Sequence, residues 1–314
     1  MMQVEQGYIP ALSLKTAVEG HGSILAEEYG AATADDRCLA IESVHPLPEF
    51  FVSEEQLRNR LLRELTLVRG IGNERERMCR RRGIQTLTDL RRTNWKSEAR
   101  EIAEVILNGS PQEITGLFRE RGRGADPLLI GFAAAVPKEN LLFFDIETLG
   151  MVHSPIILFG CGVCEGQTLR VTQYLLRDIG EEVAALSLVS GMMRAHPALV
   201  TYNGRSFDLP FTNSRLTYYG ERECRPSLHF DLLHPSRRLF RGSLPDCCLG
   251  TVEEHILGCG REEDLPGYLV PVYYQKYLRT GDTVPLKQIV DHNRSDVTSL
   301  ALLLARQTEM MYGS

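Results

Sequence analysis

The chain has 314 residues, of which 43% are hydrophobic and 24% are charged, a balance that excludes a disordered chain and allows one large core or two domains. Its first residues do not form a basic segment followed by an apolar core, and no apolar run approaches the roughly 18 residues of a membrane span, so we predict a soluble, cytoplasmic protein. Eight cysteines at irregular spacing indicate reduced thiols rather than a disulfide framework.

The formal net charge of −6 is unevenly distributed along the chain. Between Gln56 and Ile106 there are 13 Lys or Arg against 7 Asp or Glu, so the remainder is strongly acidic. This asymmetry suits a protein that contacts nucleic acid with its basic region and holds cations with its acidic one. A solvated helical face with many ion pairs is an equally good explanation of the basic region.

Residues 1–53 contain only short apolar runs, and we assign this N-terminal segment no role. From residue 54 apolar residues recur every three or four positions, which predicts a helical region over 54–118. The first predicted apolar face consists of Leu57, Leu61, Leu62, Leu65 and Val68.

Within this region, VRGIG at residues 68–72 precedes a charged helix, a further glycine and the helix-forming segment QTLTDL. The arrangement resembles the helix-hairpin-helix motif of DNA-binding and repair proteins. The resemblance implies that Gly70, Gly72 and Asn73 contact a nucleic-acid phosphate through backbone amides. Glu76 departs from the motif, which has a small apolar residue there, and its carboxylate would repel phosphate. The alternative is a hairpin that only packs on the next domain.

The segment RERGRGADP, residues 119–127, combines glycines and a proline with charged residues, so we predict a linker over 119–135. After it, strand-like runs and helical runs predict an α/β domain over 136–314. We expect strands at 141–147, 156–163, 168–175 and 198–202, and helices at 181–194, 207–218, 248–257 and 285–311.

The run LLFFDIETLG, residues 141–150, places Asp145 and Glu147 at the end of a strand whose large apolar residues predict burial on both faces. Burying two carboxylates there is unfavourable unless a cation compensates their charge. Because alternate residues of a strand point to the same face, Asp145 and Glu147 can hold a divalent metal together.

Two later segments contribute further polar residues. TYNGRSFDLPF, residues 201–211, puts Asp208 in the first turn of a helix, where the helix dipole stabilises an acid even in a structural role. In DHNRSDVTSLALLL, residues 291–304, His292 and Asp296 lie one turn apart beside a buried apolar stripe. Alone, such a pair is more often found on a surface than in a site.

Three patterns therefore occur in order: D-x-E at a strand end, N-x-x-x-F-D after a second strand, and H-x-x-x-D in the last helix. Together they resemble the DEDD superfamily of exonucleases, specifically the YprB-like bacterial proteins and the proofreading domains of family B DNA polymerases. The resemblance covers about residues 140–308. It implies a ribonuclease-H-like mixed sheet flanked by helices, preceded here by the small helical region.

The same resemblance implies a metal-dependent 3′-to-5′ exonuclease that hydrolyses single-stranded nucleic acid or frayed ends with two Mg²⁺ or Mn²⁺ ions. One ion would activate the attacking water, and the other would stabilise the leaving 3′ oxygen. The implied catalytic residues are Asp145, Glu147, Asp208, His292 and Asp296. Of these, the four acids are the implied metal ligands, and Asn203 is an implied nucleic-acid contact.

Two features leave alternatives open. His292 lies four residues before the last Asp, which is the tyrosine spacing of the polymerase branch, whereas the histidine branch uses a spacing of five. The fold could also serve as a non-catalytic nucleic-acid binder or as an adaptor in a larger complex, although an intact set of acids favours an enzyme. Asp231, Glu253 and Asp291 are acids that we do not assign to the site, and a turn or cap role is favoured for Asp231.

Overall fold

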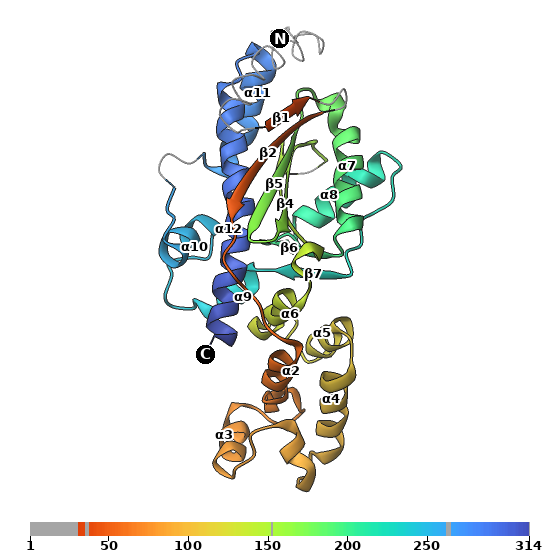
Figure 1. Ribbon diagram of the computed structural model, residues 1–314, viewed down its shortest axis with the longest axis vertical. Coiled ribbons are helices and arrows are strands. Elements are labelled where there is room, and N and C mark those ends of the chain that lie inside the picture. The colour runs from red at the N-terminus through yellow and green to blue at the C-terminus, as the bar shows by residue number, and fades with distance from the viewer. Residues whose placement is uncertain (1–30, 35–37, 152, 262–264, 314) are drawn as a thin grey trace, which may run out of the picture. The chain divides into compact units, whose positions relative to one another are not determined.

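The computed structural model describes residues 31–34, 38–151, 153–261 and 265–313. Its elements divide into two compact units, which are drawn together in Figure 1. The first unit contains the described residues up to Pro48, Lys138–Leu233 and Gly242–Leu303, and the second contains Glu49–Pro137, His234–Arg241 and the described residues from Leu304 onward. Most of the predicted N-terminal segment, residues 1–30, lies outside the described residues.

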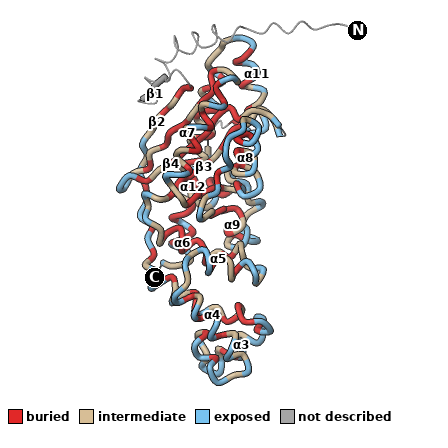
Figure 2. The backbone as a smooth tube through the Cα atoms, turned by 90° about the vertical axis from the view of Figure 1, so that its right-hand side faces the viewer, coloured by how far each residue is buried: buried red, intermediate tan, exposed pale blue. Residues whose placement is uncertain are grey.

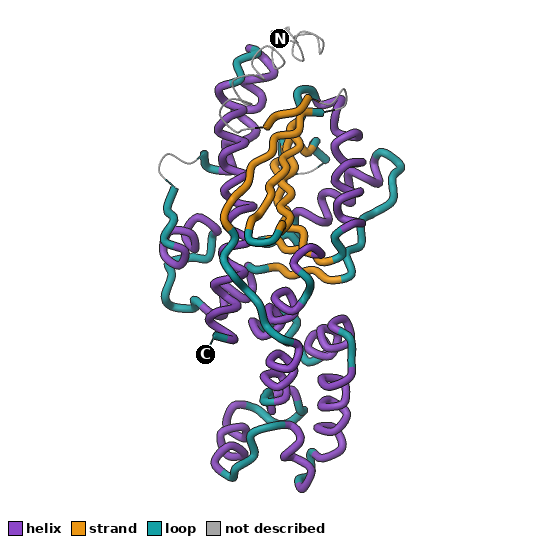
Figure 3. Tube along the Cα trace, viewed as in Figure 1, coloured by secondary structure: helices purple, strands orange, loops and turns teal. Residues whose placement is uncertain are grey.

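The first unit is built on a mixed β-sheet (Figure 3). Its described strands are β1 (Ala31–Ala34), β2 (Leu39–Pro46), β3 (Leu141–Thr148), β4 (Ile156–Glu165), β5 (Thr168–Leu175), β6 (Ala198–Thr201) and β7 (Leu228–Asp231). They form a seven-stranded sheet in the order β1-β2-β5-β4-β3-β6-β7. β3, β6 and β7 are parallel, and the other pairings are antiparallel. The carboxyl ends of β3, β6 and β7 therefore meet at one edge of the sheet.

Helices cover both faces of this sheet (Figure 1). α7 (Glu182–Ala195) and α8 (Asp208–Tyr218) lie on one side, whereas α11 (Val270–Thr280) and the long α12 (Val284–Tyr312) lie on the other. Shorter helices are α9 (Leu233–Leu239) and α10 (Leu249–Val252), the latter continued by a π-helical turn over Glu253–Leu257. The prediction of an α/β fold with a helix-flanked mixed sheet is confirmed. In the described part of the chain, no helix combines the length and apolar character required to cross a membrane.

The core lies between the sheet and these helices, and the central strands are buried along most of their length (Figure 2). Phe144 of β3 and Phe159 of β4 are fully buried. The strands expected at 141–147, 156–163, 168–175 and 198–202 correspond to β3, β4, β5 and β6. The apolar runs of β3 and β4 and the partly alternating apolar residues of β5 predict strands from local sequence alone.

β2 shows that the N-terminal segment, which has no assigned role, contributes a strand to the sheet. It pairs with β5 along its whole length, from Leu39 opposite Leu175 to Pro46 opposite Thr168. The sheet-containing unit therefore also includes residues before the predicted helical region and is not confined to 136–314. The alternation of buried and partly exposed residues in β2 spans only four positions, which is too short to identify a strand by its period.

The second unit is helical. Its helices are α2 (Glu54–Leu62), α3 (Asn73–Arg81), α4 (Lys96–Asn108), α5 (Pro111–Glu120) and α6 (Ile130–Ala135), together with most of α9 and the C-terminal end of α12. Ser53 and Ser110 form capping boxes at the starts of α2 and α5, which satisfy backbone amides that a helix leaves unpaired. The predicted apolar face is buried, but the chain leaves the α-helical path after Leu62 and makes a separate 3-10 turn at Leu65–Leu67.

The predicted linker, residues 119–135, contains folded structure in this unit. It includes the end of α5 and all of α6, in which Phe132 is buried. Its charged residues are also anchored, because the Arg123 guanidinium pairs with Glu64 at 2.8 Å and with Asp126 at 2.7 Å. Charged and small residues thus make a fixed turn here, whereas their composition alone predicted a flexible connection.

The hairpin region has the backbone geometry that its glycines permit. Gly70 has a φ of 81°, a left-handed conformation that favours glycine, and α3 begins directly after Gly72. The Glu76 carboxylate pairs with Arg80 one turn later, at 2.6 Å. The negative charge that departs from the helix-hairpin-helix pattern is therefore compensated within α3 itself. Phosphate binding by Gly70, Gly72 and Asn73 stays a prediction.

Candidate active site

β3 carries two of the candidate acids. Phe144 and Ile146 are buried on one face of the strand, and Asp145 and Glu147 alternate with them on the other. The amide nitrogen Nδ2 of Asn293, on α12, donates a hydrogen bond to Oδ2 of Asp145 at 2.8 Å. The two acids therefore share the face of the sheet against which α12 packs.

Asp208 joins them from a different segment. It is the first residue of α8 and is buried, and its Oδ1 accepts a hydrogen bond from the backbone amide of Ile146 at 3.2 Å. Because Ile146 lies between Asp145 and Glu147 in β3, this hydrogen bond holds the Asp208 carboxylate beside both acids.

The turn before α8 has a backbone conformation that positions Asp208. Asn203 has a φ of 65°, a left-handed conformation that Asn tolerates better than most residues. At Gly204 a Cβ atom would lie 2.5 Å from Thr201, so only glycine fits there. Asn203 is exposed, and its predicted contact with nucleic acid is not tested by these interactions.

Asp231, at the end of β7, supports the same turn. Its Oδ1 accepts from the backbone amides of Asn203 at 2.8 Å and Leu233 at 3.1 Å, and its Oδ2 accepts from the amide of Arg205 at 3.1 Å. These hydrogen bonds give Asp231 the turn role that its sequence position favoured. Asp231 thus holds the loop that leads to Asp208.

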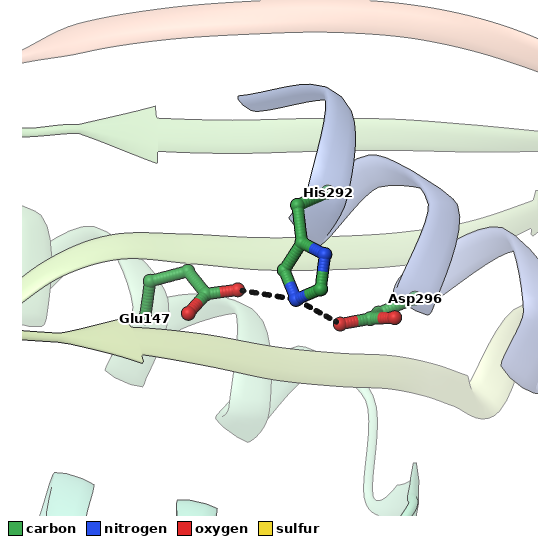
Figure 4. A group of neighbouring side chains, drawn as sticks. All are labelled: Glu147, His292 and Asp296. Atoms are coloured by element: carbon green, nitrogen blue, oxygen red, sulfur yellow. Dashed lines mark ion pairs between the residues drawn. The ribbon is translucent and has the colours of Figure 1, made fainter. Parts of the chain in front are cut away.

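α12 brings the last two candidates to β3. Figure 4 shows the His292 ring between the carboxylates of Glu147 and Asp296. Its Nε2 atom lies 3.8 Å from Oε1 of Glu147 and 3.4 Å from Oδ2 of Asp296. The three side chains each offer one ligand atom, and these atoms lie within 4.8 Å of one another. The two carboxylates of this group are hard oxygen donors, which fit a divalent cation.

The raised pKa values of the neighbouring acids also favour a cation at this site. Burial raises the pKa of Asp145 well above its usual range, and the Asp296, Asp208 and Glu147 carboxylates raise it further, against the lowering effect of the Asn293 hydrogen bond. Burial also raises the pKa of Asp208 to about 7, although backbone hydrogen bonds lower it. Crowded carboxylates that resist ionisation are stabilised in the ionised form by a bound cation.

Asn293 is a site residue whose role the sequence did not identify. It is fully buried, and besides holding Asp145 it accepts a hydrogen bond from Nε2 of Gln173 on β5 at 2.8 Å. The sequence contained a signal, because Asn293 is the one polar member of the apolar stripe of its helix. A buried amide needs partners, and here one partner is the acid itself.

Arg261 and Glu253 are also close to the site, although the sequence does not assign either of them to it. The Arg261 guanidinium forms an ion pair with Asp296, and it pairs with Oε1 of Glu253 at 2.5 Å. Its Nη1 atom lies 3.2 Å from Nδ1 of His292. No local pattern in the sequence marks this arginine, since its partners are 8 to 35 residues away in the chain.

Comparison with known proteins identifies the family. A family model for the RNase H superfamily matches residues 142–308, which contain all five candidate catalytic residues. The chain is also 39% identical over 173 residues to a protein of Bacillus subtilis (strain 168) named "Uncharacterized protein YprB". The matched region is 53% of this chain and 41% of that relative, so the chain spans well under half of the relative's length. The chain belongs to the RNase H superfamily.

Proposed function

We propose that this protein is a metal-dependent 3′-to-5′ exonuclease that hydrolyses single-stranded nucleic acid or frayed ends with two divalent ions, Mg²⁺ or Mn²⁺. One observation carries the proposal. Three segments that are far apart in the sequence bring Asp145, Glu147, Asp208, His292 and Asp296 to the same end of β3. An RNase H superfamily domain supports nuclease chemistry in general, and the order of these residues favours the exonuclease subtype.

Each side chain has a proposed task. The four carboxylates would hold the cations, and Asn293 keeps Asp145 oriented toward them by its hydrogen bond. When bound, the divalent ions supply Lewis-acid stabilisation of the charge that develops on the scissile phosphate.

The hydrogen bond at Nδ1 defines the role of His292. Arginine has donors only, so Nδ1 of His292 accepts from Arg261, and the neutral ring carries its hydrogen on Nε2. Nε2 faces Glu147 and Asp296. We therefore assign His292 the task of orienting the attacking water by hydrogen bonding rather than of removing its proton. A tyrosine hydroxyl could perform the same task.

The helical second unit would contact the phosphate backbone of the substrate. Besides the hairpin residues Gly70, Gly72 and Asn73, this unit has a pocket of about 620 Å³ whose lining includes Arg91, Lys96 and Arg100. Among the described residues these three cations form no ion pair, so their charges are available to phosphates, and apolar side chains in the same lining can contact sugar or base.

The test uses purified protein with 5′-labelled single-stranded DNA and RNA, each in Mg²⁺, Mn²⁺ or chelator. We expect a ladder of products that shortens from the 3′ end, only with metal, and no shortening when the 3′ end is blocked. Products of internal cleavage would contradict the exonuclease assignment. Binding without shortening would instead support a nucleic-acid-binding protein on this fold.

The matched variant is Asp145→Asn, which removes one negative charge and almost no volume. We expect it to lose cleavage, because a metal ligand is gone, while its circular dichroism spectrum and unfolding transition stay those of a folded protein. Metal affinity, measured by calorimetry, should fall in parallel. Full activity in a folded Asp145→Asn protein would place the active site elsewhere.

A further inference from the structure

Glu253 is a buried acid outside the proposed metal ligands. It is 1% exposed and lies in the π-helical turn that follows α10. Its Oε1 pairs with Arg261, whereas its Oε2 is buried and has no hydrogen-bond partner among the described residues. Burying a carboxylate is unfavourable unless a cation accompanies it. The Arg261 guanidinium is that cation, so Glu253 ties Arg261 to this place.

The Nη2 atom that pairs with Glu253 also reaches the candidate active site. Nη2 pairs with Asp296, and Nη1 is 3.2 Å from His292. The arginine side chain is 14% exposed, so the guanidinium is shielded from solvent on most sides. Asp296 is thus shared between Arg261 and any divalent cation that it would bind. The Asp296 carboxylate cannot pair fully with both the guanidinium and a divalent cation, because like charges a few ångströms apart repel each other.

We propose that Arg261 is a phosphate-contacting residue of this site, held by Glu253, and that it competes with the divalent cation for Asp296. The inference rests on the proposed function. When a cation takes Asp296, the Glu253 pair keeps the guanidinium beside the site, and N–H donors that were directed at Asp296 become available to the substrate phosphate. The planar fork of arginine suits the oxygens of a phosphate, whereas a lysine provides only a point charge.

The competition is tested by Mn²⁺ binding without nucleic acid, from the electron paramagnetic resonance signal of free Mn²⁺. Arg261→Gln should bind Mn²⁺ about tenfold more tightly than the wild type, because the competing charge is gone. The matched control is Arg294→Gln on α12, which removes the same charge from an arginine that pairs with Asp291 instead. It should change the affinity less than twofold. Unchanged or weaker Mn²⁺ binding by Arg261→Gln would overturn the competition.

The phosphate contact is tested by calorimetry with thymidine 5′-monophosphate at saturating Mn²⁺. Arg261→Gln should bind this monophosphate roughly tenfold more weakly, and Arg294→Gln should bind it like the wild type. Arg261→Lys separates the two parts of the proposal. Its charge should restore wild-type Mn²⁺ affinity, whereas the lost fork should leave monophosphate binding weak. Equal monophosphate binding by all four proteins would overturn the phosphate contact.

Failure of this inference can be distinguished from failure of the proposed function, because neither Mn²⁺ binding nor monophosphate binding requires cleavage. The same wild-type preparation is tested on a labelled single strand. Cleavage from the 3′ end together with unaltered Mn²⁺ and monophosphate binding in Arg261→Gln would refute this inference alone. The expected binding changes without any cleavage would refute the exonuclease and leave the assignment of Arg261 intact.

Discussion

At the residue scale, hydrogen bonds fix the orientation of the side chains in the candidate site. Arg261 determines which nitrogen of His292 faces the acids, and Asn293 determines where the Asp145 carboxylate points. His292 lies four residues before Asp296, which is the spacing of the tyrosine in the proofreading domains of family B DNA polymerases that this chain resembles. With the ring hydrogen on Nε2, a histidine at this position presents a donor in the way a tyrosine hydroxyl does.

We therefore predict that His292→Tyr keeps much of the activity and that His292→Ala loses it by about 10²- to 10⁴-fold in the catalytic step. Metal and substrate affinities should stay near those of the wild type, since the carboxylate ligands are unchanged. Single-turnover cleavage of a labelled strand measures this step directly. An alanine variant as fast as the wild type would remove His292 from the mechanism.

A second prediction at this scale concerns His229 on β7. Burial and, to a smaller extent, the nearby Arg205 guanidinium lower the pKa of His229 to about 4, against the raising effect of Asp231, so the ring is neutral in the folded chain above that pH. As the pH falls from about 6.5 toward 4, the unfolded chain binds a proton before the folded chain does, and the free energy of unfolding decreases. Between pH 6.5 and 4, the protonation of His229 lowers the free energy of unfolding by about 2–3 kcal/mol.

The check compares the wild type with His229→Gln, which can still hydrogen-bond to Thr201, the partner of His229 at 2.9 Å. Urea unfolding at several pH values between 4 and 7 should show a shallower decrease for the variant. Parallel curves would mean that the histidine does not titrate differently in the folded chain.

At the element scale, the close contact between α12 and β4 brings the candidate catalytic side chains together. At Gly160 of β4, a Cβ atom would lie 2.4 Å from Oδ1 of Asn293 and 2.6 Å from Cγ2 of Val297. Glycine therefore allows α12 to approach the sheet closely. The same helix carries His292 and Asp296, so its distance from β4 controls their distance from the acids of β3.

We predict that Gly160→Ala lowers the free energy of unfolding by about 1–3 kcal/mol, because the added methyl group overpacks a buried interface. It should also weaken Mn²⁺ binding, since α12 must move away from Asp145. The control is Gly191→Ala on α7, where a Cβ atom would meet nothing within 4 Å and where alanine favours the helix by up to about 1 kcal/mol. If urea unfolding gave the two variants equal stability, the contact at Gly160 would not be tight.

At the scale of the whole molecule, the basic and acidic regions noted in the sequence belong mainly to different units. The basic stretch between Gln56 and Ile106, which contains α3, belongs to the second unit, whereas the candidate metal ligands belong to the first. Deleting residues 1–127 would not isolate the RNase H superfamily domain, because it would also remove β2 from the sheet. Point substitutions are therefore the appropriate test of the basic region.

We predict that replacing three cations of the second-unit pocket by glutamine weakens binding of single-stranded nucleic acid and makes its salt dependence shallower. Each lost phosphate contact should reduce the log-log slope by about 0.7, so the total change should be about 2. The substituted residues are Arg91, Lys96 and Arg100. The control removes the same charge from the first unit at Arg222, Arg225 and Arg279. Equal slopes for both triple variants would show that the pocket makes no phosphate contact.

The sequence by itself determined the α/β class, the strands β3 to β6, the helices α7, α8, α10 and α12, and the five candidate catalytic residues, but it did not predict α11. These features are local, because a long apolar run or a buried helical stripe is visible within one segment. The structure then showed that the predicted acids and His292 do come together.

Only the tertiary structure revealed that β2 pairs with β5, and it alone revealed the supporting roles of Asn293, Arg261 and Glu253. β2 and its partner β5 are more than a hundred residues apart in the chain. Asn293 and Asp145 are 148 residues apart, and Arg261 and Asp296 are 35 apart. Local periodicity cannot report such pairings, because a buried polar side chain is stable only with partners that the folding of distant segments supplies.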